Sequence, residues 1–188
     1  IGARHFMLKE NVRTNLPAVL RRLVLDETDG AFGAGMLVSV LSASGGCGST
    51  TVAVNLANEL QLATSEQVLL VDMDASYGAV GTYFGIGGGY GLADVLKQGG
   101  SPDPQLVKSA SSVYTDDLHV LLSPVSVDFH TPAPLEMTSL ATAMEGCKQA
   151  YPFTVVDAPH IQPGVAGTLA TISQVTLIGL QMTVKDIQ

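Results

Sequence analysis

The feature that most constrains the fold is an apolar segment that runs into a glycine-rich loop and then into a helical pattern. From residue 37 the chain reads LVSVLSASGGCGSTTVAVNLA. Glycines let the backbone bend so that successive N–H groups converge, and the positive end of the following helix favours an anion there. This is the layout of a phosphate-binding loop between a strand and a helix. The alternative is an ordinary glycine-rich turn.

The candidate phosphate-binding residues come from this loop and from the first turn of the helix. Aligned with the pattern GxxxxGK[ST], the chain has Ala43 where the first glycine stands and Ser49 where the lysine stands. The hydroxyl of Thr50 is placed to reach a magnesium ion. The predicted cofactor-binding set is Gly45, Gly46, Cys47, Gly48, Ser49, Thr50 and Thr51.

Carboxylates follow two further apolar segments. Asp72 and Asp74 end the segment LLVDMD, and Asp157 ends FTVVDAP. Near a phosphate loop, such carboxylates support a magnesium shell or position an attacking water. We therefore predict a metal site of Thr50, Asp72 and Asp157, with Asp74 as the catalytic residue. The alternative for each carboxylate is an ordinary acidic residue at a strand end.

Apolar segments of strand length alternate with helical patterns along the chain. This alternation predicts an α/β fold with a doubly wound, mainly parallel sheet that is covered on both faces. A loop with three prolines is expected over 123–134. The predicted strands are 36–42, 67–72, 118–122, 153–157 and 174–180, and the predicted helices are 49–62, 90–98, 103–111, 134–149 and 164–172.

The first 35 residues have a different composition. Residues 5–8 predict a short strand, and Asn15 predicts the N-cap of a helix whose apolar face repeats at i, i+3, i+4 and i+7. Residues 26–35 are acidic and glycine-rich, as in a linker. Because the chain begins inside such an element, we expect it to be a piece of a longer protein.

The charge distribution disfavours binding to DNA. The net charge is −8, and from residue 31 onward the chain has four lysines, no arginine and 13 acidic residues. DNA binding depends on the neutralisation of phosphates by Lys and Arg. No apolar run is long enough to span a bilayer. The two cysteines, Cys47 and Cys147, are too far apart for a metal motif, so a reduced cytoplasmic setting is expected.

Other side chains receive structural interpretations. Cys147 lies in a helical pattern and is expected in the core. Tyr83 and Phe84 are interpreted as packing residues. The histidines are scattered without ligand spacing and predict no metal site; they are His5, His119, His130 and His160.

Taken together, these segments resemble the ParA/MinD class of P-loop ATPases, whose deviant Walker A motif is commonly KGGxGKTT followed by an apolar helix that contains Asn. Within that class the chain looks most like the CpaE/TadZ branch of Flp (Tad) pilus assembly proteins. The segments that carry this likeness are VDMDASYGAVGTYFGI from residue 71, GLADVL from residue 91, LHVLLSP from residue 118 and YPFTVVDAPH from residue 151.

The resemblance implies a domain organisation. Residues 1–25 would be the last strand and helix of a receiver-like domain, 26–35 a linker, and 36–188 a ParA/MinD-like P-loop domain that lacks its C-terminal elements. By the same resemblance, Asp72 and Asp157 match magnesium-shell positions and Asp74 the water-positioning one. Ser44 and Ser49 stand where the family carries its two functional lysines.

The resemblance and the missing lysines together predict a function. We expect a localisation or scaffold factor for Flp pilus assembly and secretion machinery, with ATP and Mg²⁺ bound weakly and hydrolysis weak or absent. It would act as a homodimer in the cytoplasm, at a cell pole or at the inner-membrane periphery, with polar or pilus proteins as partners and only indirect contact with the membrane. The alternative is a slow Mg-ATPase that dimerises with nucleotide in protein positioning or DNA partition.

Overall fold

The computed structural model of the chain describes residues 5–11, 14–16, 18–19, 35–75, 78–87, 89–101, 103–123 and 135–181. The chain divides into two compact units, Ile1–Gly33 and Ala34–Gln188. Among the described residues, no helix combines the length and the apolar character needed to cross a membrane.

The larger unit is built on a six-stranded sheet with the strand order β3-β4-β2-β5-β1-β6. Neighbouring strands are parallel except for the β3–β4 pair, which is antiparallel. The strands are β1 (Met36–Ser42), β2 (Val68–Asp72), β3 (Ser112–Val113), β4 (Leu118–Leu121), β5 (Phe153–Ala158) and β6 (Val175–Gly179). The predicted α/β class with a mainly parallel sheet is confirmed.

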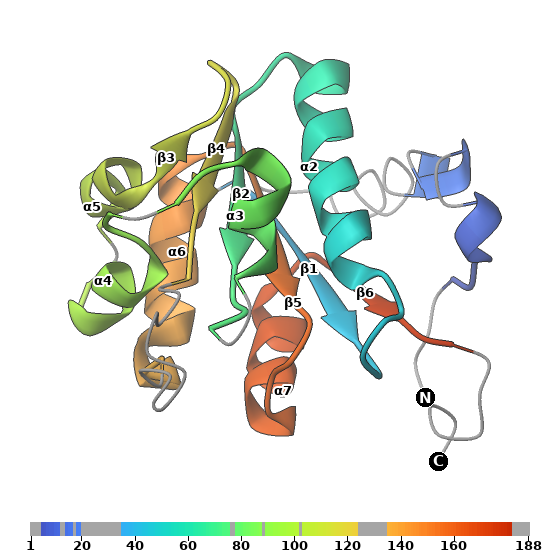
Figure 1. Cartoon of the computed structure of the whole chain (residues 1–188). Helices are drawn as coiled ribbons and strands as arrows, with labels where there is room; N and C mark the ends of the chain where they lie inside the picture. The colour runs from blue at the N-terminus through green and yellow to red at the C-terminus, as the bar shows by residue number, and fades with distance from the viewer. Residues whose placement is uncertain are drawn as a thin grey trace, which may run out of the picture. The chain divides into compact units, whose positions relative to one another are not determined.

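Helices lie on both sides of this sheet (Figure 1). Helices α2 and α3 lie on one side, whereas α6 and α7 lie on the other, and α4 and α5 pack against α6. The helical elements are α2 (Ser49–Thr64), α3 (Ala79–Phe84), α4 (Leu92–Lys97), α5 (Pro104–Ala110), η2 (Met137–Ser139), α6 (Leu140–Ala150) and α7 (Pro163–Ile172).

The central strands are apolar along almost their whole length because both of their faces are covered. Every residue of β2 is buried, and so are the inner residues of β1 and β5. Cys147 belongs to the same core, as expected, and burial raises the pKa of its thiol to about 12.

In the larger unit, all five predicted strands and all five predicted helices are present, with shifts at their ends. The helix expected over 134–149 begins instead as the 3₁₀ turn η2 and continues as α6. Two elements were not predicted, the two-residue strand β3 and the six-residue helix α3. Most of the loop expected over 123–134 lies outside the described residues.

The predicted strand over 5–8 is wrong. These residues form no regular element, and they precede a 3₁₀ turn, η1 (Lys9–Asn11). Phe6 and Leu8 are 69% and 52% exposed, so they lack the burial that stabilises an apolar strand. Residues 14–16 and 18–19 are helical, so the helix begins before Asn15. The receiver-like remnant and the linker remain predictions.

One glycine fixes the position of α4 against the sheet. The backbone nitrogen of Leu92 donates to the carbonyl oxygen of Leu122, just after β4, at 2.8 Å. A Cβ added at Gly91 would collide with that same carbonyl oxygen, whereas a Cβ at Gly87 would meet nothing within 4 Å. The close approach of two backbones therefore requires glycine at position 91.

We predict that Gly91→Ala lowers the free energy of unfolding by about 1–3 kcal/mol, because α4 must move away from Leu122 to admit the methyl group. Gly87→Ala is the matched control, and it should change stability by less than about 1 kcal/mol. Urea unfolding of both variants tests this. Equal stability of the two variants would contradict the packing described here.

Candidate functional site

The glycine-rich loop leads from β1 to α2 through two residues in the left-handed backbone region. Gly46 has φ 80° and Gly48 has φ 84°. Residues with a side chain rarely adopt these backbone angles, so the turn requires glycine at both positions. Gly48 caps α2, and Ser49 is the first helical residue. The N–H groups of the first turn of this 16-residue helix have no partner within the helix and can receive an anion.

The side chain at the lysine position is turned into the loop itself. The hydroxyls of Ser42 and Ser49 lie 2.6 Å apart in a hydrogen bond, and the Cys47 thiol donates to the Ser42 hydroxyl at 3.3 Å. Ser49 is 4% exposed. The loop is therefore closed by its own short polar side chains.

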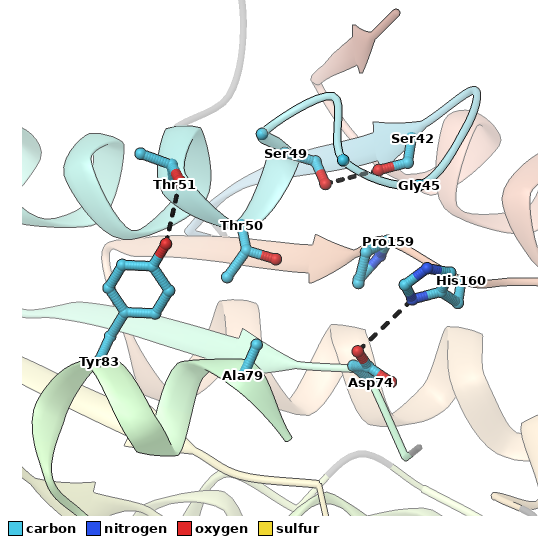
Figure 2. Close-up of a pocket in the computed structure, with 12 residues that line it drawn as sticks. Ser42, Gly45, Ser49, Thr50, Thr51, Asp74, Ala79, Tyr83, Pro159 and His160 are labelled. Carbon is cyan, nitrogen blue, oxygen red and sulfur yellow. Dashed lines mark hydrogen bonds and ion pairs between the residues drawn. The ribbon is translucent and has the colours of Figure 1, made fainter. Parts of the chain in front are cut away.

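A pocket of about 320 Å³ lies in front of this loop (Figure 2). Among the described residues that line it, none is a lysine or an arginine. The lining residues are Ser42, Gly45, Gly46, Gly48, Ser49, Thr50, Thr51, Asp74, Ala79, Tyr83, Pro159 and His160.

Six of the seven predicted cofactor-binding residues line this pocket, and so does Asp74. Cys47 does not; it is buried, and its thiol is close to Gly179 on β6. Asp72 and Asp157 do not line the pocket either, because both are fully buried.

Two pocket residues were given other interpretations from the sequence. Tyr83 is 55% exposed, and its hydroxyl forms a 3.0 Å hydrogen bond with the Thr51 hydroxyl, so it is not a packing residue. His160 was treated as one of four scattered histidines. Its Nδ1 lies 3.5 Å from an Asp74 carboxylate oxygen. Its position three residues after Asp157, at the end of the same strand, was the signal that could have identified it.

Asp72 and Asp157 are register partners on the adjacent strands β2 and β5. The Asp72 carboxylate accepts from the backbone nitrogen of Asp74 at 2.8 Å and from that of Val80 at 3.3 Å. These contacts hold the start of α3 against the end of β2. Burial raises the pKa of Asp72 to about 6, partly offset by the two backbone donors.

Asp157 has a different environment. Within the part of the chain that the structure describes, neither of its carboxylate oxygens accepts a hydrogen bond of good geometry. Burial raises its pKa to about 7; the nearby Thr50 hydroxyl opposes this rise, while the charges of Asp72 and Asp74 add to it. A buried carboxylate without a donor fits a neighbouring cation.

These residues fit Mg²⁺ only with help from a ligand. The described residues contain no group of three or more His, Cys, Asp or Glu side chains close enough to hold a metal. Magnesium commonly takes one or two protein oxygens and completes its shell with phosphates and water. Asp157 and the Thr50 hydroxyl supply such oxygens, and the metal roles of Thr50, Asp72 and Asp157 remain predictions.

Comparison with solved structures identifies the fold. The chain is similar to a ParA-family ATPase from Chlorobium tepidum (21% identity over 77% of this chain and 60% of that one, TM-score 0.66). It is also similar to the kinase domain of the Escherichia coli tyrosine kinase ETK (18% identity, 95% and 66%, TM-score 0.71). A third match is the septum site-determining protein MinD from Pyrococcus horikoshii, solved with Mg-ADP (22% identity, 77% and 57%, TM-score 0.62).

The fold is therefore that of the ParA/MinD-type P-loop NTPases. The chain spans less than two thirds of the length of each of these three structures. No family model matches the sequence, and no curated protein matches it significantly.

The environment of Asp157 predicts a stability that depends on pH. Because its pKa is raised in the folded state, the folded chain binds more protons than the unfolded chain between about pH 4 and pH 7. Stability therefore falls as the pH rises through this window. We predict that Asp157→Asn raises the free energy of unfolding at pH 8 by roughly 2–4 kcal/mol and leaves it nearly unchanged at pH 4.

Asp72→Asn is the control for this prediction. It also removes a buried charge, but its amide NH₂ replaces the acceptor of one of the two backbone N–H groups that bind Asp72, so it should not stabilise the protein. Denaturant unfolding at pH 4 and pH 8 tests both variants. A loss of stability in Asp157→Asn at pH 8 would contradict this description of the site.

Proposed function

We propose that this pocket binds the phosphates of ATP with Mg²⁺, weakly, and that the protein acts through dimerisation and recruitment with little or no hydrolysis. One observation carries the proposal: the pocket combines a phosphate-type loop, a helix N-terminus and a buried acidic strand end, yet no lysine or arginine lines it among the described residues.

Groups for holding phosphates are present in the loop. The backbone N–H groups around Gly46, Gly48 and Ser49 approach the pocket at the start of α2, and the hydroxyls of Thr50 and Thr51 lie beside them. Backbone nests and helix N-termini bind phosphates through such groups. The loop therefore retains groups that can hold phosphates in the absence of a lysine.

The pocket has fewer groups for accelerating hydrolysis than for holding phosphates. Each charge-assisted hydrogen bond to phosphate contributes roughly 1.5–3 kcal/mol, so serines at positions 44 and 49 weaken binding by up to several orders of magnitude. Charge that develops on the transferring phosphoryl group needs still stronger stabilisation. Magnesium, when bound, would neutralise part of the phosphate charge. Asp74 at the pocket wall would position water, and Thr50 and Asp157 would hold the metal.

We assign the cellular role through the resemblance to the CpaE/TadZ branch: a scaffold or localisation factor for Flp pilus assembly, working as a homodimer with polar or pilus proteins. The GLADVL segment supports this role as part of that resemblance; its first residues lie at the start of α4. The second candidate is a slow Mg-ATPase in protein positioning or partition. The acidic balance after residue 31 favours a protein partner over DNA.

Calorimetry with Mg-ATP tests the proposal. The dissociation constant of the unmodified protein is expected on the order of 0.1–1 mM. The double variant Ser44→Lys/Ser49→Lys should bind at least about tenfold more tightly, because it restores two cationic contacts to an intact loop.

Ser101→Lys/Ser109→Lys is the matched control, because both serines are exposed and neither lines the pocket. It adds the same charge and should leave the affinity within about threefold. No binding at millimolar nucleotide by the unmodified protein, together with no gain in the loop variant, would overturn the proposal.

A further inference from the structure

The pocket contains one side chain that can carry a positive charge. Among its described lining residues only His160 has a basic group, and its side chain is 49% exposed, so it can meet a ligand. The remaining polar lining consists of hydroxyls, backbone groups and the Asp74 carboxylate.

His160 is placed between the acidic wall of the pocket and the glycine loop (Figure 2). Its Nδ1 lies 3.5 Å from an oxygen of Asp74, which is itself 3% exposed and so fixed in position. Its Nε2 lies on the loop side of the ring, 3.9 Å from where a Cβ of Gly45 would be. Gly45 directly follows Ser44, a position where the resembled family has lysine. The imidazole thus reaches the loop from the opposite wall.

We propose that His160, held by Asp74, supplies the cationic phosphate contact that the loop lacks. An imidazolium donates from both nitrogens, so Nδ1–H faces the Asp74 carboxylate while Nε2–H donates to a phosphate oxygen. This inference rests on the proposed nucleotide binding, and it adds the residue that selects among nucleotides.

The placement of His160 implies a preference for a longer phosphate chain. The start of α2 approaches the pocket from one wall, whereas Asp74 and His160 approach it from the ends of two other strands. When one phosphate of a nucleotide is held at the helix N-terminus, the His160 side of the pocket is open to a further phosphate of the same nucleotide. His160 therefore favours a nucleoside triphosphate over the diphosphate.

Calorimetry with Mg-ATP and Mg-ADP on the 188-residue chain tests this inference. His160→Gln keeps the size and polarity of the side chain without its charge, and it should weaken ATP binding about tenfold while ADP binding changes less than about threefold. His160→Lys should restore ATP binding to within about threefold of the unmodified protein. Lys97→Gln removes an exposed positive charge outside the pocket and should change neither affinity.

The possible failures are distinguishable. If the unmodified protein binds ATP and His160→Gln binds it equally well, the inference is wrong and the proposed function stands. An equal loss of ATP and ADP binding, or a loss that lysine does not rescue, also overturns the role assigned to the charge. If the unmodified protein and the Ser44→Lys/Ser49→Lys variant bind no nucleotide, both the proposed function and this inference are wrong.

Discussion

The parallel packing of β1, β5 and β2 is the constraint on which the rest of the site depends. β5 lies between the other two strands, so Leu41 is paired with Ala158, and Asp72 with Asp157, at one edge of the sheet. Three parts of the pocket follow directly from this edge: the glycine loop after β1, Asp74 after β2 and His160 after β5. A shift of one strand by a residue would turn each of its side chains to the opposite face of the sheet and separate these groups.

The apolar runs and the glycines of the sequence predict the main parts of this arrangement. The central strands β1, β2 and β5 are buried on both faces, and Gly46 and Gly48 stand where the backbone needs a left-handed turn. Short elements that depend on tertiary contacts were missed. Helix α3 has six residues. In its first turn, the backbone nitrogen of Val80 donates to the carboxylate of Asp72, which lies eight residues earlier in the chain. The pairing of His160 with Asp74 likewise exists only once β2 and β5 are adjacent.

The site combines a buried carboxylate of raised pKa with a loop that has no charged side chain. Asp157 is buried without a good donor, and burial raises its pKa to about 7, a cost that a purely structural carboxylate would avoid. Proteins retain such a destabilising buried carboxylate where a bound ligand or metal stabilises its charge. The loop, in contrast, is closed by the Ser42–Ser49 hydrogen bond and offers backbone groups in place of lysine. These features suit a nucleotide that is held to stabilise one state of the protein more than one that is turned over.

A crystal structure of the protein with Mg²⁺ and a non-hydrolysable ATP analogue is the most direct test of whether the loop holds phosphates. Phosphates are expected against the backbone nitrogens of residues 45–50, with an imidazole nitrogen of His160 within hydrogen-bond distance of a phosphate oxygen. A structure grown at millimolar nucleotide that shows the loop without phosphates, or phosphates bound elsewhere on the protein, would contradict it.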